Sequence, residues 1–147
     1  MKFRLIIDKE KEEELLLVAH EHSDLTRQIE QLVQSYNGTD RICAYADDEM
    51  RLLQFSDIEC ITVFDGKTYA IDAQAERYRL KQRLYELEEI LPSYFIRINK
   101  STLANETRLE RFQASFSGAV DAIFRCGYRE YVSRRCFASI KRRFNQK

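Results

Sequence analysis

The sequence lacks several features that would place it in a specialised class of protein. It has one proline and four glycines, which argues against linkers, low complexity and disorder. No apolar run reaches the roughly 18 residues that a membrane-spanning helix needs. The stretch Leu5-Ile6-Ile7 is too short for the core of a signal peptide, and charged residues follow it at once. We therefore expect a cytoplasmic protein without a membrane span.

Cysteine is also scarce, and its spacing argues against a zinc site. The four cysteines, Cys43, Cys60, Cys126 and Cys136, form no Cys-x-x-Cys pair and lie far from both histidines. In a reducing compartment the thiols are expected to be free. Cys43 and Cys60 lie in strand-like runs and are expected to act as small buried apolar residues. The basic neighbours of Cys126 and Cys136 can lower a thiol pKa, so redox sensing there stays open.

Recognisable catalytic motifs are absent as well. The chain has no Walker loop, no glycine-rich dinucleotide turn and no Gly-x-Ser-x-Gly elbow. His20 and His22 have a spacing that can hold a metal, but surface histidines fit this acidic stretch better. The acidic cluster Asp47-Asp48-Glu49 is explained by solvation of a turn. We predict no catalytic residue, no metal site, no cofactor and no small-molecule substrate.

The 147 residues are enough to bury a core, and their patterns predict a mainly β domain over residues 40–147. Asp65-Gly66 is a hairpin signal between two of its strands. Leu80, Leu84, Leu87 and Leu91 predict one helix face, closed by a proline, and a last helix is expected over 136–144. The expected strands of this domain cover residues 41–46, 51–55, 58–64, 68–72, 94–98, 108–116, 119–125 and 128–132.

Residues 1–38 are expected to form a small α+β extension, a candidate dimerisation or regulatory region. Residues 3–7 predict a strand, and the apolar run at 15–18 fits either a strand or a helix. A helix is expected to start at Ser23 or Asp24 and to stop at Asn37-Gly38. Its apolar residues share one face: Leu25, Ile29, Leu32 and Tyr36.

A net charge of zero, from 24 basic and 24 acidic residues, suggests at first that the chain does not bind nucleic acid. The charges are segregated, however. Residues 8–30 carry eight acids against three bases, a net charge of −5, whereas residues 125–147 carry eight bases against one acid, a net charge of +7. Because salt screens distant charges over about 10 Å at 0.1 M, the local balance decides binding to phosphates. A basic end is typical of nucleic-acid binding, and a solvated helix tail explains it equally well.

Two segments carry donors in a pattern that suits nucleic acid. The strand that begins at Phe95 alternates apolar with polar residues and ends in Asn99-Lys100-Ser101, whose side chains can bond base edges and phosphates. In the second segment Ser133 can cap the last helix. Arg134 and Arg135 then fall at a helix N-terminus, where the macrodipole disfavours cations, so the pair suggests a bound phosphate. Arg97 fits either a DNA contact or an ion pair within the protein.

The order and spacing of four segments resemble the LytTR family of bacterial DNA-binding domains over about residues 40–144. The segments are Leu84 to Pro92, Phe95 to Ser101, Asn105, and Val132 to Arg135. The resemblance implies about ten strands in a stack of small antiparallel sheets with short helices. It also implies that loops between strands, rather than a recognition helix, enter successive major grooves. Residues 1–38 are too short for a receiver domain, as in the small standalone members of the family.

The resemblance implies a role for individual residues by position. Lys100 and Arg135 are the expected base readers, and Asn105 is expected to serve loop structure. The residues expected to contact DNA are Lys67, Asn99, Lys100, Ser101, Arg125, Ser133, Arg134 and Arg135.

We therefore predict a bacterial, sequence-specific transcriptional regulator of double-stranded DNA that acts as a homodimer on paired direct repeats. Standalone relatives in the family suggest an inhibitory membrane protein as a further partner. The alternative is a protein-interaction module whose acidic helix binds a partner protein and whose basic end has no binding role. An RNA binder would need exposed stacking aromatics, and the chain has no RNP-like motif.

Overall fold

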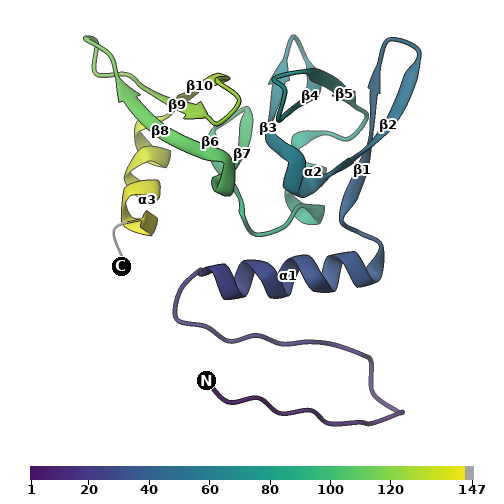
Figure 1. The fold of residues 1–147 in the computed structure, drawn as a ribbon. Coiled ribbons are helices and arrows are strands. Elements are labelled where there is room, and N and C mark those ends of the chain that lie inside the picture. Colours follow the sequence, from purple (N-terminus) through teal and green to yellow (C-terminus); the bar gives the residue numbers. More distant parts are fainter. Residues whose placement is uncertain (145–147) are drawn as a thin grey trace.

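The computed structural model describes residues 1–144 and contains two antiparallel sheets (Figure 1). The larger sheet has seven strands in the order β2-β1-β5-β4-β3-β7-β6, and the smaller has the order β10-β9-β8. The mainly β architecture is confirmed. The elements are α1 (Asp24–Asn37), β1 (Arg41–Ala46), β2 (Glu49–Gln54), η1 (Phe55–Asp57), β3 (Ile58–Phe64), β4 (Lys67–Asp72), β5 (Arg77–Leu80), α2 (Leu84–Ile90), β6 (Phe95–Asn99), β7 (Thr102–Asn105), η2 (Glu106–Arg108), β8 (Leu109–Ala114), β9 (Val120–Phe124), β10 (Arg129–Val132) and α3 (Arg134–Phe144).

Tight hairpins join neighbouring strands of the large sheet. Asp65 and Gly66 connect β3 to β4 and have φ angles of 53° and 71°. Positive φ at both central residues is what a two-residue type I′ turn requires. The Asp-Gly hairpin is therefore confirmed, and it sets the pairing of Phe64 with Lys67.

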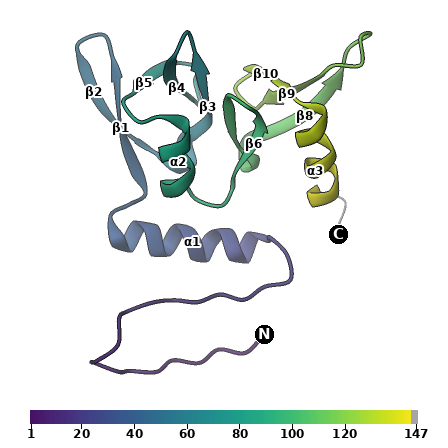
Figure 2. The ribbon, with the colours of Figure 1, turned by 180° about the vertical axis from the view of Figure 1, so that it is seen from behind.

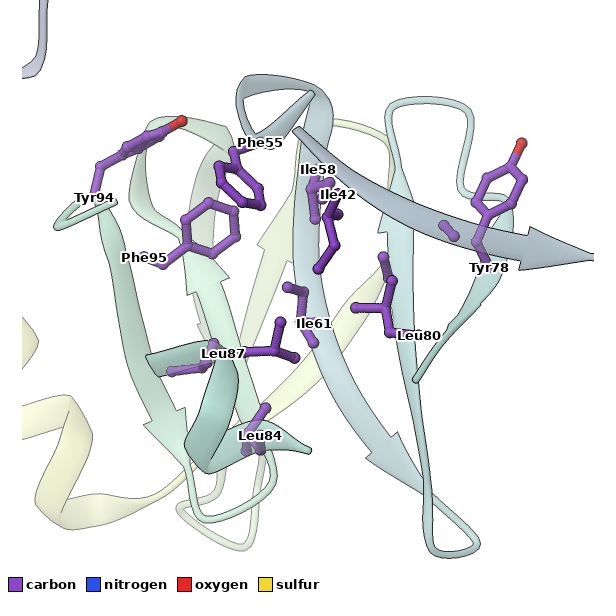
Figure 3. Close-up of a cluster of buried hydrophobic side chains, with 13 residues drawn as sticks. Ile42, Phe55, Ile58, Ile61, Tyr78, Leu80, Leu84, Leu87, Tyr94 and Phe95 are labelled. Atoms are coloured by element: carbon purple, nitrogen blue, oxygen red, sulfur yellow. The ribbon is translucent and has the colours of Figure 1, made fainter. Parts of the chain in front are cut away.

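The large sheet buries apolar side chains on both of its faces. Along β3, Ile61 belongs to one core cluster and its neighbour Cys60 to the other, because successive side chains of a strand point to opposite faces. The first cluster lies between the sheet and α2, and Figure 3 shows Leu84 and Leu87 of that helix pointing into it. Phe55 and Phe95 meet there edge to face, with ring centroids 6.4 Å apart.

The second cluster attaches the small sheet and α3 to the other face of β6 and β3. Ile98 of β6, Phe124 of β9, Val132 of β10 and Ile140 of α3 are all buried in it. Figure 2 shows α3 and the small sheet at the β6 edge of the molecule. The two core clusters are therefore joined through the large sheet, because β3, β6 and β7 contribute side chains to both.

Helix α1 lies across the end of the domain, as Figures 1 and 2 both show. Ser23 caps its N-terminus by accepting from the Thr26 backbone N–H, and Gly38 ends it in the left-handed region with φ of 70°. The Glu30 carboxylate accepts from the Ser93 backbone N–H at 2.6 Å. Arg27 lies 3.7 Å from the carboxylate of Glu106, which is buried. These polar contacts hold α1 against the domain.

Several expectations are corrected by the structure. Residues 3–7 are not a strand, because no other segment pairs with them, and the predicted α+β extension contains a helix alone. The predicted helix is confirmed as α1, but Leu32 and Tyr36 of its predicted apolar face are exposed to solvent. Leu80 belongs to β5, where it pairs with Thr68, so α2 starts only at Leu84. None of the helices within residues 1–144 combines the length and apolarity needed to cross a bilayer.

The surroundings of the cysteines and histidines decide what these residues can do. All four cysteines are free, and Cys60 is fully buried, whereas Cys43 is only half-buried. Burial raises the pKa of the Cys126 thiol, which is opposite to the activation that its basic neighbours suggested. Within residues 1–144, no group of three metal-ligating side chains comes together.

Candidate nucleic-acid interface

The turn between β6 and β7 presents Lys100 on the surface, supported from below by Asn99. Asn99 is buried, and its side-chain Oδ1 accepts from the Ser101 backbone N–H at 2.7 Å. Arg97 donates to the Lys100 carbonyl oxygen at 2.7 Å. The turn is therefore fixed by two side chains, while the Lys100 side chain stays exposed.

The junction between β10 and α3 lies beside this turn. The Ser133 backbone N–H donates to the Ile98 carbonyl oxygen at 2.9 Å. The Ser133 hydroxyl oxygen accepts from the Cys136 backbone N–H at 3.2 Å, which confirms Ser133 as the N-terminal cap of α3. Arg134 and Arg135 follow in the first turn of the helix, and both are exposed.

Asn99 joins the two segments directly. Its side-chain amide nitrogen donates to the Tyr131 carbonyl oxygen at 2.6 Å, two residues before Ser133. Both polar atoms of the buried amide are thus engaged by the protein. This geometry gives Asn99 a positioning role between the loops rather than an exposed surface for DNA.

The β3–β4 hairpin adjoins the same region. The Val63 backbone N–H donates to the Ser101 carbonyl oxygen at 2.9 Å, close to the end of β3. Lys67 is exposed on the far side of the hairpin turn. Figure 1 shows this hairpin and the β6–β7 pair pointing away from α1. The hydrogen bonds of Val63, Asn99 and Ser133 therefore hold three segments near one another. The segments are Asp65–Lys67, Asn99–Ser101 and Ser133–Arg135, which we call the loop face.

The two arginines of the loop face point to different sides of α3. Arg135 lines a groove of about 330 Å³ together with Arg97 and Ile96 of β6. Arg134 instead lines a groove of about 440 Å³ that reaches the β8–β9 loop and Lys141. Arg134 and Arg135 thus lie on opposite sides of the first turn of α3, where both can contact a polyanion that crosses this helix.

The exposed cations of the loop face are not neutralised by acids. Within residues 1–144, no ion pair shorter than 4.0 Å involves Lys67, Lys100, Arg134 or Arg135. In this part of the chain, the donors of all four side chains are therefore available to a ligand.

Arg97, by contrast, is paired inside the protein. It forms an ion pair with Glu88 of α2, which confirms the internal alternative for this residue. The two residues come from different elements with no helical or cross-strand spacing between them, so the sequence carried no signal for this partner. Through its bond to the Lys100 carbonyl, Arg97 links α2 to the β6–β7 turn.

Comparison with known families identifies the domain. Residues 48–145 match the family model for the LytTr DNA-binding domain. The chain belongs to the LytTR family of DNA-binding domains. A solved LytTr DNA-binding domain, from a protein described as a methyl-accepting/DNA response regulator of Bacillus cereus, has the same fold with a TM-score of 0.64. It is 20% identical in sequence, and the match covers 72% of this chain and 97% of that one.

Relatives of this LytTR protein also match in its extension. Two Staphylococcus aureus proteins, from strains MSSA476 and NCTC 8325, are 32% and 30% identical, and each match covers 99% of both chains. Both are described as uncharacterised HTH-type transcriptional regulators. In the described part of this chain, α1, α2 and α3 are separated from one another by strands, so residues 1–144 contain no helix-turn-helix.

One predicted contact of the LytTR domain lies apart from the loop face. The Arg125 backbone N–H donates to the Arg108 carbonyl, and the next residue, Cys126, donates its N–H to the Glu59 carboxylate at the start of β3. The loop face lies beyond the opposite end of β3. A strand of seven residues spans roughly 23 Å. Arg125 is exposed and remains a prediction as a separate phosphate contact.

Replacing Asn99 by alanine is expected to loosen the LytTR loop face. The change leaves the Tyr131 carbonyl and the Ser101 N–H without their partners, which costs about 1–3 kcal/mol of unfolding free energy. DNA affinity is expected to fall as well, because the two loops lose their link. Urea unfolding and DNA titration measure the two effects.

Asn105→Ala is the matched control. Asn105 is equally buried and donates its amide N–H to the Ile58 carbonyl at 3.0 Å, at the other end of β7. Similar destabilisation with unchanged DNA affinity is expected. A loss of affinity as large as that of Asn99→Ala would contradict the positioning role.

Proposed function

We propose that this protein is a sequence-specific transcriptional regulator that reads double-stranded DNA with its loop face. The observation that carries the proposal is that Asn99 and Ser133 tie two cation-bearing loops together within a LytTR domain. The relatives described as transcriptional regulators support the regulatory role. Lys100 and Arg135 are the proposed base readers, because Lys and Arg side chains recognise guanine in the major groove.

The remaining residues of the loop face are proposed to position the duplex. Lys67, Ser101, Ser133 and Arg134 lie at the rims of the two loops and the hairpin, where phosphate contacts fix register without reading sequence. The Ser133 hydroxyl oxygen accepts from the Cys136 backbone N–H, which leaves the hydroxyl hydrogen for a phosphate oxygen. Arg125 is proposed to contact a phosphate further along the duplex.

The protein is further proposed to bind as a homodimer at paired direct repeats. A single loop face is small, and two copies side by side would double the number of contacts. An inhibitory membrane protein stays a prediction from the standalone members of the family.

Selection from a pool of random duplexes tests the proposal. The full chain, bound and washed at moderate salt, is expected to enrich a direct repeat spaced by about one helical turn. The affinity for the enriched site is expected to fall with salt with a log–log slope of about −5, because three phosphate-contacting cations in each of two copies displace counterions at roughly 0.9 per phosphate. No duplex binding even at low salt would favour the protein-interaction module instead.

A further inference from the structure

The first 22 residues form an extended arm that carries a large apolar surface. The arm reverses direction at residues 8–11, and Figures 1 and 2 show its two limbs passing below α1. Phe3, Leu5 and Ile7 of the first limb are exposed by 71–89%. Val18 of the second limb is exposed by 80%. Water-exposed apolar side chains in such density mark an interaction surface.

The backbone of the arm is also unpaired. Within residues 1–144, its hydrogen bonds are confined to the reversal, where the backbone N–H groups of Lys11 and Glu10 donate to Asp8. Neither limb joins a sheet. An extended apolar segment with free backbone donors and acceptors is a template for pairing with another strand.

An open cavity lies between the second limb and α1. It has a volume of about 520 Å³. Its apolar lining includes Leu15, Leu17, Ile29 and Val33, and polar side chains such as His20 and Glu30 line the rest. A cavity of about 150 Å³ already holds one benzene-sized group. The space can therefore take several apolar side chains, such as those that the first limb exposes.

The charges of the two limbs are complementary. The first limb, residues 1–7, carries Lys2 and Arg4 and no acid. The start of the second limb carries Glu12, Glu13 and Glu14 without a basic residue among them. Residues 1–7 thus carry a net charge of +2, and residues 12–22, which also include Glu21, carry −4, so the first limb of one copy attracts the second limb of another.

We propose that the arm is the homodimer interface, and that the first limb of each copy pairs with the second limb of the other and fills its cavity. A second copy is the fitting occupant because this one chain presents both an extended apolar segment and a partly apolar cavity beside a limb of opposite net charge. Reciprocal exchange satisfies both halves twice. Residues 19–23, which form no helix or strand, join each arm to its α1, so the two domains can take the same orientation on a direct repeat. The proposal rests on the homodimer of the proposed function and names its surface.

The position of the arm allows the dimer to bind DNA. Glu30 and Arg27 fix α1 to the domain through Ser93 and Glu106. Helix α1 lies at the end of the domain away from the β3–β4 hairpin of the loop face. Pairing through the arms therefore leaves both loop faces uncovered.

Mass measurement of the full chain tests the interface. Light scattering at micromolar concentration is expected to give twice the chain mass of 17.5 kDa. Leu5→Asp/Ile7→Asp is expected to weaken self-association at least about tenfold without unfolding the domain, because both side chains are exposed within one copy. Phe116→Asp, at the fully exposed tip of the β8–β9 hairpin, is the control and is expected to leave the mass unchanged. A monomeric wild-type chain, or a double variant of unchanged mass, overturns the proposal.

Charge-reversed variants distinguish pairing of limbs between two copies from pairing of the two limbs of one copy. Lys2→Glu/Arg4→Glu and Glu12→Lys/Glu13→Lys are each expected to be monomeric, because every limb then faces its own charge. Their equimolar mixture restores opposite charges at both pairings and is expected to recover the dimer. A mixture that stays monomeric while wild type is dimeric overturns the exchange. A monomeric wild-type chain that sediments with phosphatidylglycerol vesicles instead overturns it in favour of lipid.

DNA titration tests the arm interface separately from the proposed function. Leu5→Asp/Ile7→Asp is expected to bind a single half-site with wild-type affinity and to lose the added affinity of a repeat. A wild-type dimer that binds no duplex refutes the proposed function alone. A wild-type monomer that binds a half-site refutes the arm interface alone.

Discussion

Arg135→Ala is expected to lower affinity for the selected DNA site by about fivefold to 150-fold, or about 1–3 kcal/mol. Arg135 is exposed in the first turn of α3 and has no acid partner within residues 1–144, so its donors are available for a base edge. The neighbouring Ser133 cap does not depend on this side chain, and the fold is expected to keep its stability. Fluorescence anisotropy with labelled duplexes measures the loss.

Specificity distinguishes base reading from simple attraction. If Arg135 reads a guanine, the loss is confined to the selected site, and the variant binds unrelated duplexes as wild type does. Arg135→Lys keeps the charge but not the bidentate fork, so it is expected to recover only part of the affinity. Arg41→Ala removes an exposed arginine just after α1, far from the loop face, and is expected to change nothing. An equal loss on every duplex would contradict base reading.

Local patterns were sufficient to predict much of the large sheet. The strands at 41–46 and 58–64 and the Asp65-Gly66 hairpin are confirmed, because alternation and turn chemistry act over a few residues. The helix face through Leu80 failed for the same reason. Leu80 fits a helical spacing locally, but its pairing with Thr68 in β4 is a contact that spacing does not reveal.

The exposed residues of the candidate interface could be predicted from the sequence, but the buried residues that position its loops could not. Lys100 and Arg135 lie in short polar runs next to predicted element ends, and the structure leaves both exposed. Asn99 has the same local signature, yet its amide is buried against Tyr131, a partner 32 positions away in sequence. The local sequence around a polar residue at a strand end does not show whether its side chain faces solvent or a neighbouring loop. That distinction needs the packing of β6 against β10.

Phe124→Ala is expected to lower the free energy of unfolding by about 3–5 kcal/mol. Phe124 is fully buried in the second core cluster, beside Ile98, Val132 and Ile140. The substitution removes a ring from a site where four elements meet, so neighbouring side chains fill the space only in part. Urea unfolding followed by circular dichroism measures the change. Phe116→Ala, at a fully exposed position, is expected to stay within about 0.5 kcal/mol of wild type.

The same substitution tests whether the two core clusters unfold together. Leu87→Ala opens a cavity in the first cluster, on the other face of the large sheet, and is expected to cost about 2–5 kcal/mol. Because β3, β6 and β7 contribute side chains to both clusters, each variant is expected to shift one common transition. If Phe124→Ala instead produced a separate early transition, the small sheet and α3 would unfold independently. The loop face would then depend on the less stable of the two units, since Ser133 follows β10 directly and both arginines belong to α3.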